Sequence, residues 1–252
     1  MRRVVAIAVL LLAPGVVVAD RAEDLGLEFV DVPAARQSSY PGLLGEIYAR
    51  TYQPQRWGDK TTAAHEETHG TNSAIRNKHG TSDSCNAMYV GGNRGILIQE
   101  PRVSLNTVAR YLPPAMREMS YDLYFRQSLR DWQYNTLYLC DEWSAYVNCT
   151  AVGAESGRVG YSDALQMAEF TVYVIAAACA VDGHKPDYDA RQMRAAIAWM
   201  CEMRVMPLLA KPGAEAGAAH WRKFQTRRDC QALREFCRGW FGTAWCRSVF
   251  HF

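Results

Sequence analysis

Apolar positions in the second half of the chain recur every three to four residues, a period that predicts amphipathic helices. Glycines and prolines separate these runs and are typical of turns. The pattern predicts helices at about 104–111, 114–132, 136–150, 162–181, 188–209 and 218–238. One stretch, Ala164 to Val181, is apolar on nearly every side, which predicts a buried central helix.

The first half of the chain has a different pattern. Residues 20–39 show little periodicity and read as extended, whereas Leu43 to Tyr52 has a short helical pattern. The stretch from residue 86 to 99 places apolar triplets on both sides of a glycine-rich segment, Gly91 to Gly95, and this predicts a β-hairpin. The expected fold class is therefore α+β and mainly α-helical.

The N-terminus has the order of a secretory signal. Arg2 and Arg3 precede an apolar run from Val4 to Leu12, and small residues follow up to Ala19. We expect cleavage after Ala19 and a secreted or periplasmic protein whose residues 20–252 form one domain. No later stretch is expected to cross a membrane.

Composition narrows the classes of partner. The chain of 252 residues has 28 basic and 26 acidic residues, a net charge of +2, so no nucleic-acid partner is expected. It contains eight cysteines, and an even number in an exported protein favours disulfides, here in the helical C-terminal part.

The segment from residue 65 to 69 reads His-Glu-Glu-Thr-His, an H-E-x-x-H pattern. Asp59 can cap the helix that contains it. Residues i and i+4 share one helical face, so His65 and His69 can direct two imidazoles at one zinc ion. Glu66 is then placed to accept a proton from a metal-activated water. Glu67 departs from the usual uncharged position, and its carboxylate is expected to face solvent.

A catalytic zinc ion needs a third protein ligand, and two segments offer candidates. Asp141-Glu142-Trp143-Ser144-Ala145 lies on a predicted helix, and Glu142 is the preferred ligand. Asp141 is expected either to orient a histidine or to take the ligand role itself. Asp83 is the alternative from the segment after the motif helix, where its other interpretation is a turn residue.

Together, segments 62–70 and 141–146 resemble the zincin-type H-E-x-x-H zinc metallopeptidases, and within them the gluzincins. The extended three-histidine motif of metzincins is absent, because Asn72 and Ile75 occupy its last two positions. The resemblance implies a motif helix, a glutamate helix and a small sheet whose edge, here the 86–99 hairpin, binds an extended peptide. It also implies a Zn²⁺ cofactor and a peptide or protein substrate.

The resulting hypothesis is a secreted zinc metallopeptidase with Glu66 as general base. A zinc amidase acting on other amide substrates, and an inactive metal-binding or interaction domain, are the alternatives. A side chain that stabilises the developing oxyanion would complete the site. The candidates for this role are Tyr134, Tyr138, His79 and Arg94.

Overall fold

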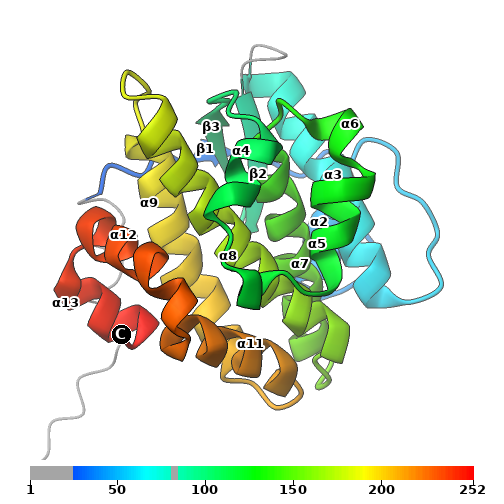
Figure 1. Cartoon of the computed structure of the whole chain (residues 1–252). Helices are drawn as coiled ribbons and strands as arrows, with labels where there is room; N and C mark the ends of the chain where they lie inside the picture. Colours follow the sequence, from blue (N-terminus) through cyan, green and yellow to red (C-terminus); the bar gives the residue numbers. More distant parts are fainter. Residues whose placement is uncertain (1–24, 81–84) are drawn as a thin grey trace, which may run out of the picture.

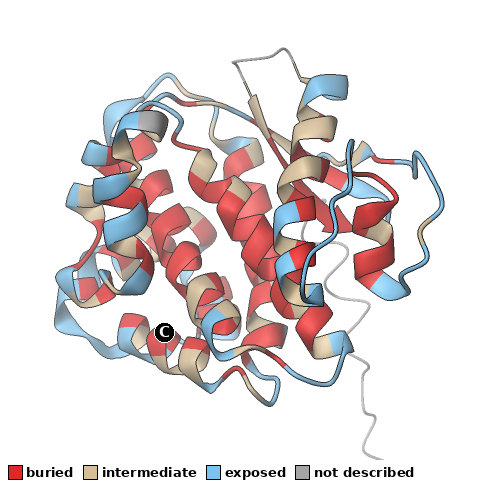
Figure 2. Ribbon diagram, turned by 90° about the vertical axis from the view of Figure 1, so that its right-hand side faces the viewer, coloured by how far each residue is buried: buried red, intermediate tan, exposed pale blue. Residues whose placement is uncertain are grey.

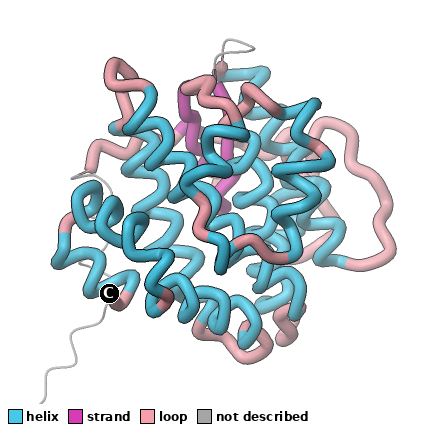
Figure 3. Tube along the Cα trace, viewed as in Figure 1, coloured by secondary structure: helices cyan, strands magenta, loops and turns pink. Residues whose placement is uncertain are grey.

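The computed structural model describes residues 25–80 and 85–252, and it is mainly helical with a small sheet at one side (Figures 1 and 3). The signal segment 1–19 and Asp83 lie outside the described residues. The longer helices are α2 (Gly42–Tyr48), α3 (Lys60–His79), α4 (Leu105–Tyr111), α7 (Tyr138–Glu155), α8 (Tyr161–His184), α9 (Arg191–Met200), α11 (Glu215–Thr226) and α12 (Gln231–Phe241). An α+β fold that is mainly helical, as predicted, is thus observed.

The sheet has three antiparallel strands in the order β1-β3-β2. The predicted hairpin is present as β2 (Cys85–Gly91) and β3 (Arg94–Gln99), with Met88 opposite Ile96. Its two turn residues, Gly92 and Asn93, both have positive φ, as a tight turn between twisted strands requires. The short strand β1 (Val30–Asp31) was expected only as extended chain, because two residues carry no alternation that the sequence could reveal.

Helix α8 runs through the middle of the molecule, with α7 and α3 on one side and α9 and α12 on the other (Figure 1). Buried residues concentrate on the interior helices (Figure 2). By length and composition alone α8 could cross a membrane, although no stretch after the N-terminal signal was expected to be long and apolar enough. However, 83% of its most apolar window is buried inside the protein, as predicted for a central core helix.

Three predicted helices are interrupted in the structure. The stretch 114–132 consists of short helical turns, of which α5 (Met119–Asp122) and α6 (Leu129–Trp132) are α-helical and Leu123–Gln127 is a π-helix. The backbone N–H of Ser120 bonds Glu169 of α8 instead of a preceding carbonyl of its own segment.

The predicted helix 218–238 is divided into α11 and α12 at Arg227, whose backbone is extended. Similarly, the stretch 188–209 contains a π-helical turn, Cys201–Val205, between α9 and α10 (Met206–Leu209). Tertiary packing overrides helical propensity at these points. The C-terminal α13 (Thr243–Trp245) and the following π-turn (Cys246–Phe250) were not predicted.

The eight cysteines, all within the described residues, form no disulfide, and no two lie at disulfide distance. The disulfide-stapled C-terminal part expected from the sequence is therefore not observed. Aromatic packing joins these elements instead, for example between Trp245 and Phe250, whose ring centroids are 4.7 Å apart. Aromatic side chains bury large apolar areas, which stabilises such a cluster without a covalent link.

Candidate metal centre

Helix α3 carries both histidines of the motif. The Asp59 carboxylate accepts hydrogen bonds from the backbone N–H groups of Thr61 and Thr62, so the helix begins where the sequence predicts. One turn apart on the same face, His65 and His69 bring their Nε2 atoms to within 3.2 Å of each other. The His65 ring also packs against the ring of Tyr146, with centroids 4.4 Å apart.

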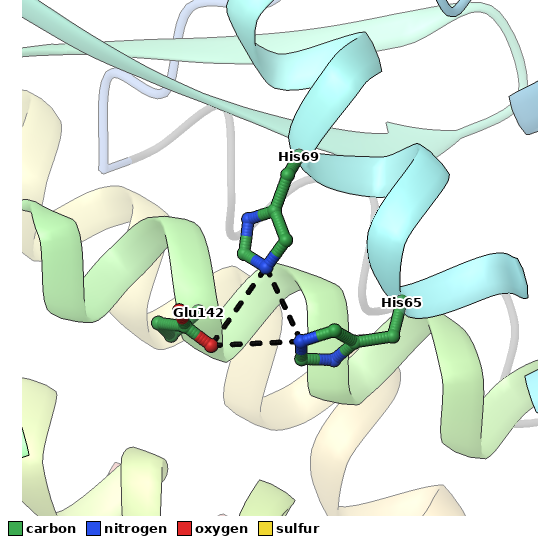
Figure 4. Close-up of side chains that lie close together, drawn as sticks. All are labelled: His65, His69 and Glu142. Atoms are coloured by element: carbon green, nitrogen blue, oxygen red, sulfur yellow. Dashed lines mark hydrogen bonds and ion pairs between the residues drawn. The ribbon is translucent and has the colours of Figure 1, made fainter. Parts of the chain in front are cut away.

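Glu142 of α7 completes a triangle with the two histidines (Figure 4). Its Oε2 atom lies 3.6 Å from Nε2 of His65 and 3.8 Å from Nε2 of His69. The hydroxyl of Tyr124 donates to Oε2 at 3.0 Å, and that of Tyr138 donates to Oε1 at 2.6 Å. These two bonds hold the buried carboxylate in the orientation that faces the imidazoles.

The spacing of the three donor atoms fits a zinc ion. Ligand atoms about 2.0–2.2 Å from a tetrahedral zinc ion lie about 3.3–3.6 Å from one another. The observed separations of 3.2, 3.6 and 3.8 Å are close to these values. Two imidazoles and one carboxylate are also one of the ligand sets found in catalytic zinc sites, which keep a fourth position open.

Asp141 orients His69 from behind. Its Oδ2 atom accepts a hydrogen bond from Nδ1 of His69 at 2.7 Å, and its Oδ1 atom accepts one from the Asn72 amide at 2.6 Å. The Asn72 carbonyl in turn accepts the backbone N–H of Tyr89 at 2.6 Å. Nδ1 of His69 therefore carries a proton in either charge state, and Nε2 is the ring nitrogen that faces Glu142 and His65. Of the two roles considered for Asp141, this hydrogen bond fits the orienting one.

Electrostatics distinguish the two histidines. Burial and the neighbouring His69 lower the pKa of His65 to about 3, so His65 is neutral and able to bind a metal. Burial also acts to lower the pKa of His69, but the hydrogen bond and charge of Asp141 and the charge of Glu142 raise it to about 9. Burial raises the pKa of Glu142. A cation bound between the three side chains would instead lower the pKa of Glu142 and displace the Nε2 proton of His69.

The site opens into a cavity of about 1090 Å³. Glu66, exposed on α3, lines this cavity together with the three metal-ligand candidates. Side chains from β2, from the loop after β3 and from the segment before α7 form its other walls, among them Asn86, Arg102, Trp132 and Tyr134. The general-base candidate and the candidate ligands therefore share one solvent-accessible space.

The prediction for Glu67 is wrong. Its side chain is 3% exposed, and its Oε1 atom accepts hydrogen bonds from the backbone N–H of Gln55 and the indole N–H of Trp57, at 2.7 and 2.8 Å. The loop before α3 folds back over this face of the helix. The charged residue in the motif thus holds the loop in place, and periodicity within α3 could not reveal a partner outside it.

The four candidates for oxyanion stabilisation differ in their position relative to the cavity. Tyr134 is exposed and lines the cavity, whereas Tyr138 is engaged by Glu142. Arg94 stacks on Phe29 and Trp199, and neither Arg94 nor His79 is among the residues lining the cavity. Tyr124 was missed, because it comes from the broken stretch 114–132, in which no spacing relates it to Glu142.

The outer edge of β2 is partly covered. Asn72 accepts the Tyr89 N–H, the Asn148 amide donates to the Tyr89 carbonyl at 3.0 Å, and Arg204 donates to the carbonyl of Val90. An extended peptide therefore cannot pair with this part of β2. The 86–99 hairpin, expected to supply a peptide-binding edge, therefore offers only part of that edge, and its Cys85–Asn86 end lines the cavity.

Comparisons with protein-family models, with curated proteins and with solved structures find no match to this chain.

Proposed function

We propose that this protein is an exported zinc-dependent metallopeptidase. The observation that carries the proposal is the triangle of His65, His69 and Glu142, whose donor atoms have the spacing of zinc ligands and lie beside Glu66 in an open cavity. The spacing supports one ion with a vacant fourth position, as hydrolysis requires.

Each side chain of the site has a distinct task in this proposal. A bound zinc ion would lower the pKa of a water molecule and polarise the carbonyl of the scissile bond. Glu66 would serve as the general base, taking a proton from the attacking water and passing it to the leaving amine. Asp141 keeps the proton of His69 on Nδ1. Tyr124 and Tyr138 orient Glu142, and Tyr134 is the cavity residue available to stabilise the oxyanion.

The size of the cavity favours a polymeric substrate over a small one. Its volume of about 1090 Å³ is at the upper end for sites that enclose small molecules. Because β2 is covered at Tyr89, peptide backbone would be held by side chains of the cavity walls and by the Cys85–Asn86 end of the strand.

The Glu66→Gln variant tests the mechanism. Purified wild-type and variant protein are incubated with a broad peptide library with and without chelator, and the zinc content is measured by mass spectrometry. The variant should keep its zinc, because Glu66 is not a ligand, and lose activity by a factor of about 10² to 10⁴. Glu235→Gln, an exposed change on α12, is the matched control. Wild-type cleavage by Glu66→Gln, or wild-type protein without metal, would overturn the proposal.

The covered edge of β2 favours a second candidate function, a zinc amidase for amide substrates other than extended peptides. The class of substrate that is cleaved distinguishes the peptidase from the amidase. Cleavage within library peptides supports the peptidase, whereas chelator-sensitive release of amine from small amides, with the library left intact, supports the amidase.

A further inference from the structure

A second group of metal-ligand side chains lies apart from the first. Glu118 comes directly before α5, Glu169 lies on α8 and His220 lies on α11. One ligand atom from each lies within 4.8 Å of the others. We propose that these three residues bind a second divalent transition-metal ion, of which zinc is the representative, at a site that serves to hold the fold around the first.

Two of the three side chains are fully enclosed and have polar atoms without partners. Glu169 is 0% exposed, and its Oε2 atom accepts bonds from the hydroxyl and the backbone N–H of Ser120, at 2.5 and 3.2 Å. Among the described residues, its Oε1 atom has no hydrogen-bond partner. His220 is 1% exposed, and neither of its ring nitrogens has one. The buried hydroxyl of Tyr173, one turn beyond Glu169, is likewise without a partner.

Unsatisfied buried polar atoms are rare in folded proteins, and several in one place indicate a group that binds them. A water molecule could bond one or two of these atoms. A cation accounts better for the carboxylate and for one imidazole nitrogen, because it takes a lone pair from each together and offsets the burial of the carboxylate charge.

The chemical state of the ligands suits a metal ion. Burial lowers the pKa of His220 to about 4, so the imidazole is neutral and has a free lone pair at neutral pH. Its Nδ1 atom is 3.5 Å from Oε2 of Glu118, whose other oxygen pairs with Lys223. Glu118 can therefore give one oxygen to the ion and keep its contact with Lys223. An imidazole with two carboxylates suits zinc and neighbouring transition metals.

The location suggests what the ion would do. The segment that begins with Glu118 also contains Ser120 and Tyr124, and Tyr124 bonds the candidate ligand Glu142 of the first site. An ion bound by Glu118, Glu169 and His220 would fasten this irregular segment to α8 and α11. It would thereby hold Tyr124 against Glu142, without contacting the substrate.

The metal content of the full-length protein tests the proposal. Protein is loaded with zinc and dialysed, and zinc per chain is measured for wild type, Glu169→Gln, His69→Gln and the matched surface control Glu235→Gln. We expect about two zinc ions per chain in wild type and in the control, and about one in each of the other variants. If His69→Gln alone lowers the content, or if Glu169→Gln has the content of wild type, the second site is refuted while the first stands.

A crystallographic measurement keeps the test decisive if Glu169→Gln fails to fold. Anomalous scattering from zinc-loaded wild-type crystals should show a peak between Glu118, Glu169 and His220, separate from any peak at His65 and His69. A map with no anomalous peak between those three residues would overturn the proposal, whatever is found at the first site.

Discussion

Replacing Asp141 with asparagine perturbs the first site at one atom, and the hydrogen bonds around it predict the result. Asp141 accepts from both His69 and Asn72. Asn72 cannot turn its amide to compensate, because its carbonyl already accepts the Tyr89 N–H. An asparagine at position 141 has one acceptor oxygen and one amino group, so it can satisfy either His69 or Asn72 but not both.

The expected loss has two parts. Removing a residue that orients a metal-bound histidine lowers metal affinity by about 10- to 100-fold, or about 1.4–2.7 kcal/mol. In the metal-free protein, the pKa of His69 at about 9, against an ordinary 6.5, corresponds to about 3 kcal/mol, to which the hydrogen bond and charge of Asp141 contribute most and the charges of Glu142 and Glu66 the rest. Because this pKa is raised, the stabilisation is complete below pH 6.5 and is lost as the pH rises through about 9.

The assay is zinc competition against a chelating indicator, combined with urea unfolding of the metal-free protein between pH 6 and pH 10. Asp141→Asn should bind zinc more weakly and should be less stable than wild type at pH 6, with a difference that narrows towards pH 10. Asp187→Asn, an exposed acid-to-amide change, is the matched control. Wild-type zinc affinity in Asp141→Asn would refute the role assigned to the carboxylate.

Three further changes test the supports of the site. Asp59→Ala removes the cap of α3 and should lower the free energy of unfolding by about 1 kcal/mol at pH 7. Hydrogen bonds lower the pKa of Asp59, so the cap stabilises the fold fully above about pH 4 and its stabilisation is lost as the pH falls through the pKa of folded Asp59. An equal loss of stability in Asp59→Ala at pH 7 and at pH 2 would contradict this. Glu67→Leu should accelerate proteolysis in the 52–58 loop, because it removes the oxygen that accepts the bonds from Gln55 and Trp57. Glu67→Gln keeps an acceptor oxygen and should not. Equal proteolysis rates in the two variants would show that these hydrogen bonds do not hold the loop. Gly217→Ala places a Cβ 2.3 Å from the carbonyl oxygen of Ala164 and should lower the free energy of unfolding in urea by about 1–3 kcal/mol. The control Gly239→Ala, whose Cβ would have nothing within 4 Å, should leave it unchanged. Similar stabilities of the two variants would argue against this close approach of α11 to α8.

Several features of this protein follow from short stretches of sequence. The i, i+4 spacing places His65 and His69 on one face, Asp59 caps their helix and the glycine-rich turn closes the hairpin. The uniformly apolar stretch after Ala164 becomes the buried helix α8. Each depends on interactions between residues close together in the chain, which is why periodicity and turn chemistry predict them.

The choice between Asp141 and Glu142 depends on tertiary structure. Both residues lie on the same predicted helix, and both were candidates for the ligand role. How α7 packs against α3 determines that Glu142 faces the Nε2 atoms while Asp141 meets Nδ1 of His69. Neighbouring residues on a helix point about 100° apart, so a small rotation of α7 would exchange their roles.

The remaining features missed from the sequence have the same origin. Tyr124 reaches Glu142 because the stretch 114–132 breaks and bonds to α8, and Glu67 is buried because a loop folds over it. Glu118, Glu169 and His220 come from three separate segments and show no ligand spacing. The sequence by itself determined one helix with two histidines and a nearby carboxylate. Only the packing of distant segments decided which side chains surround them, because those contacts depend on the whole fold rather than on local periodicity.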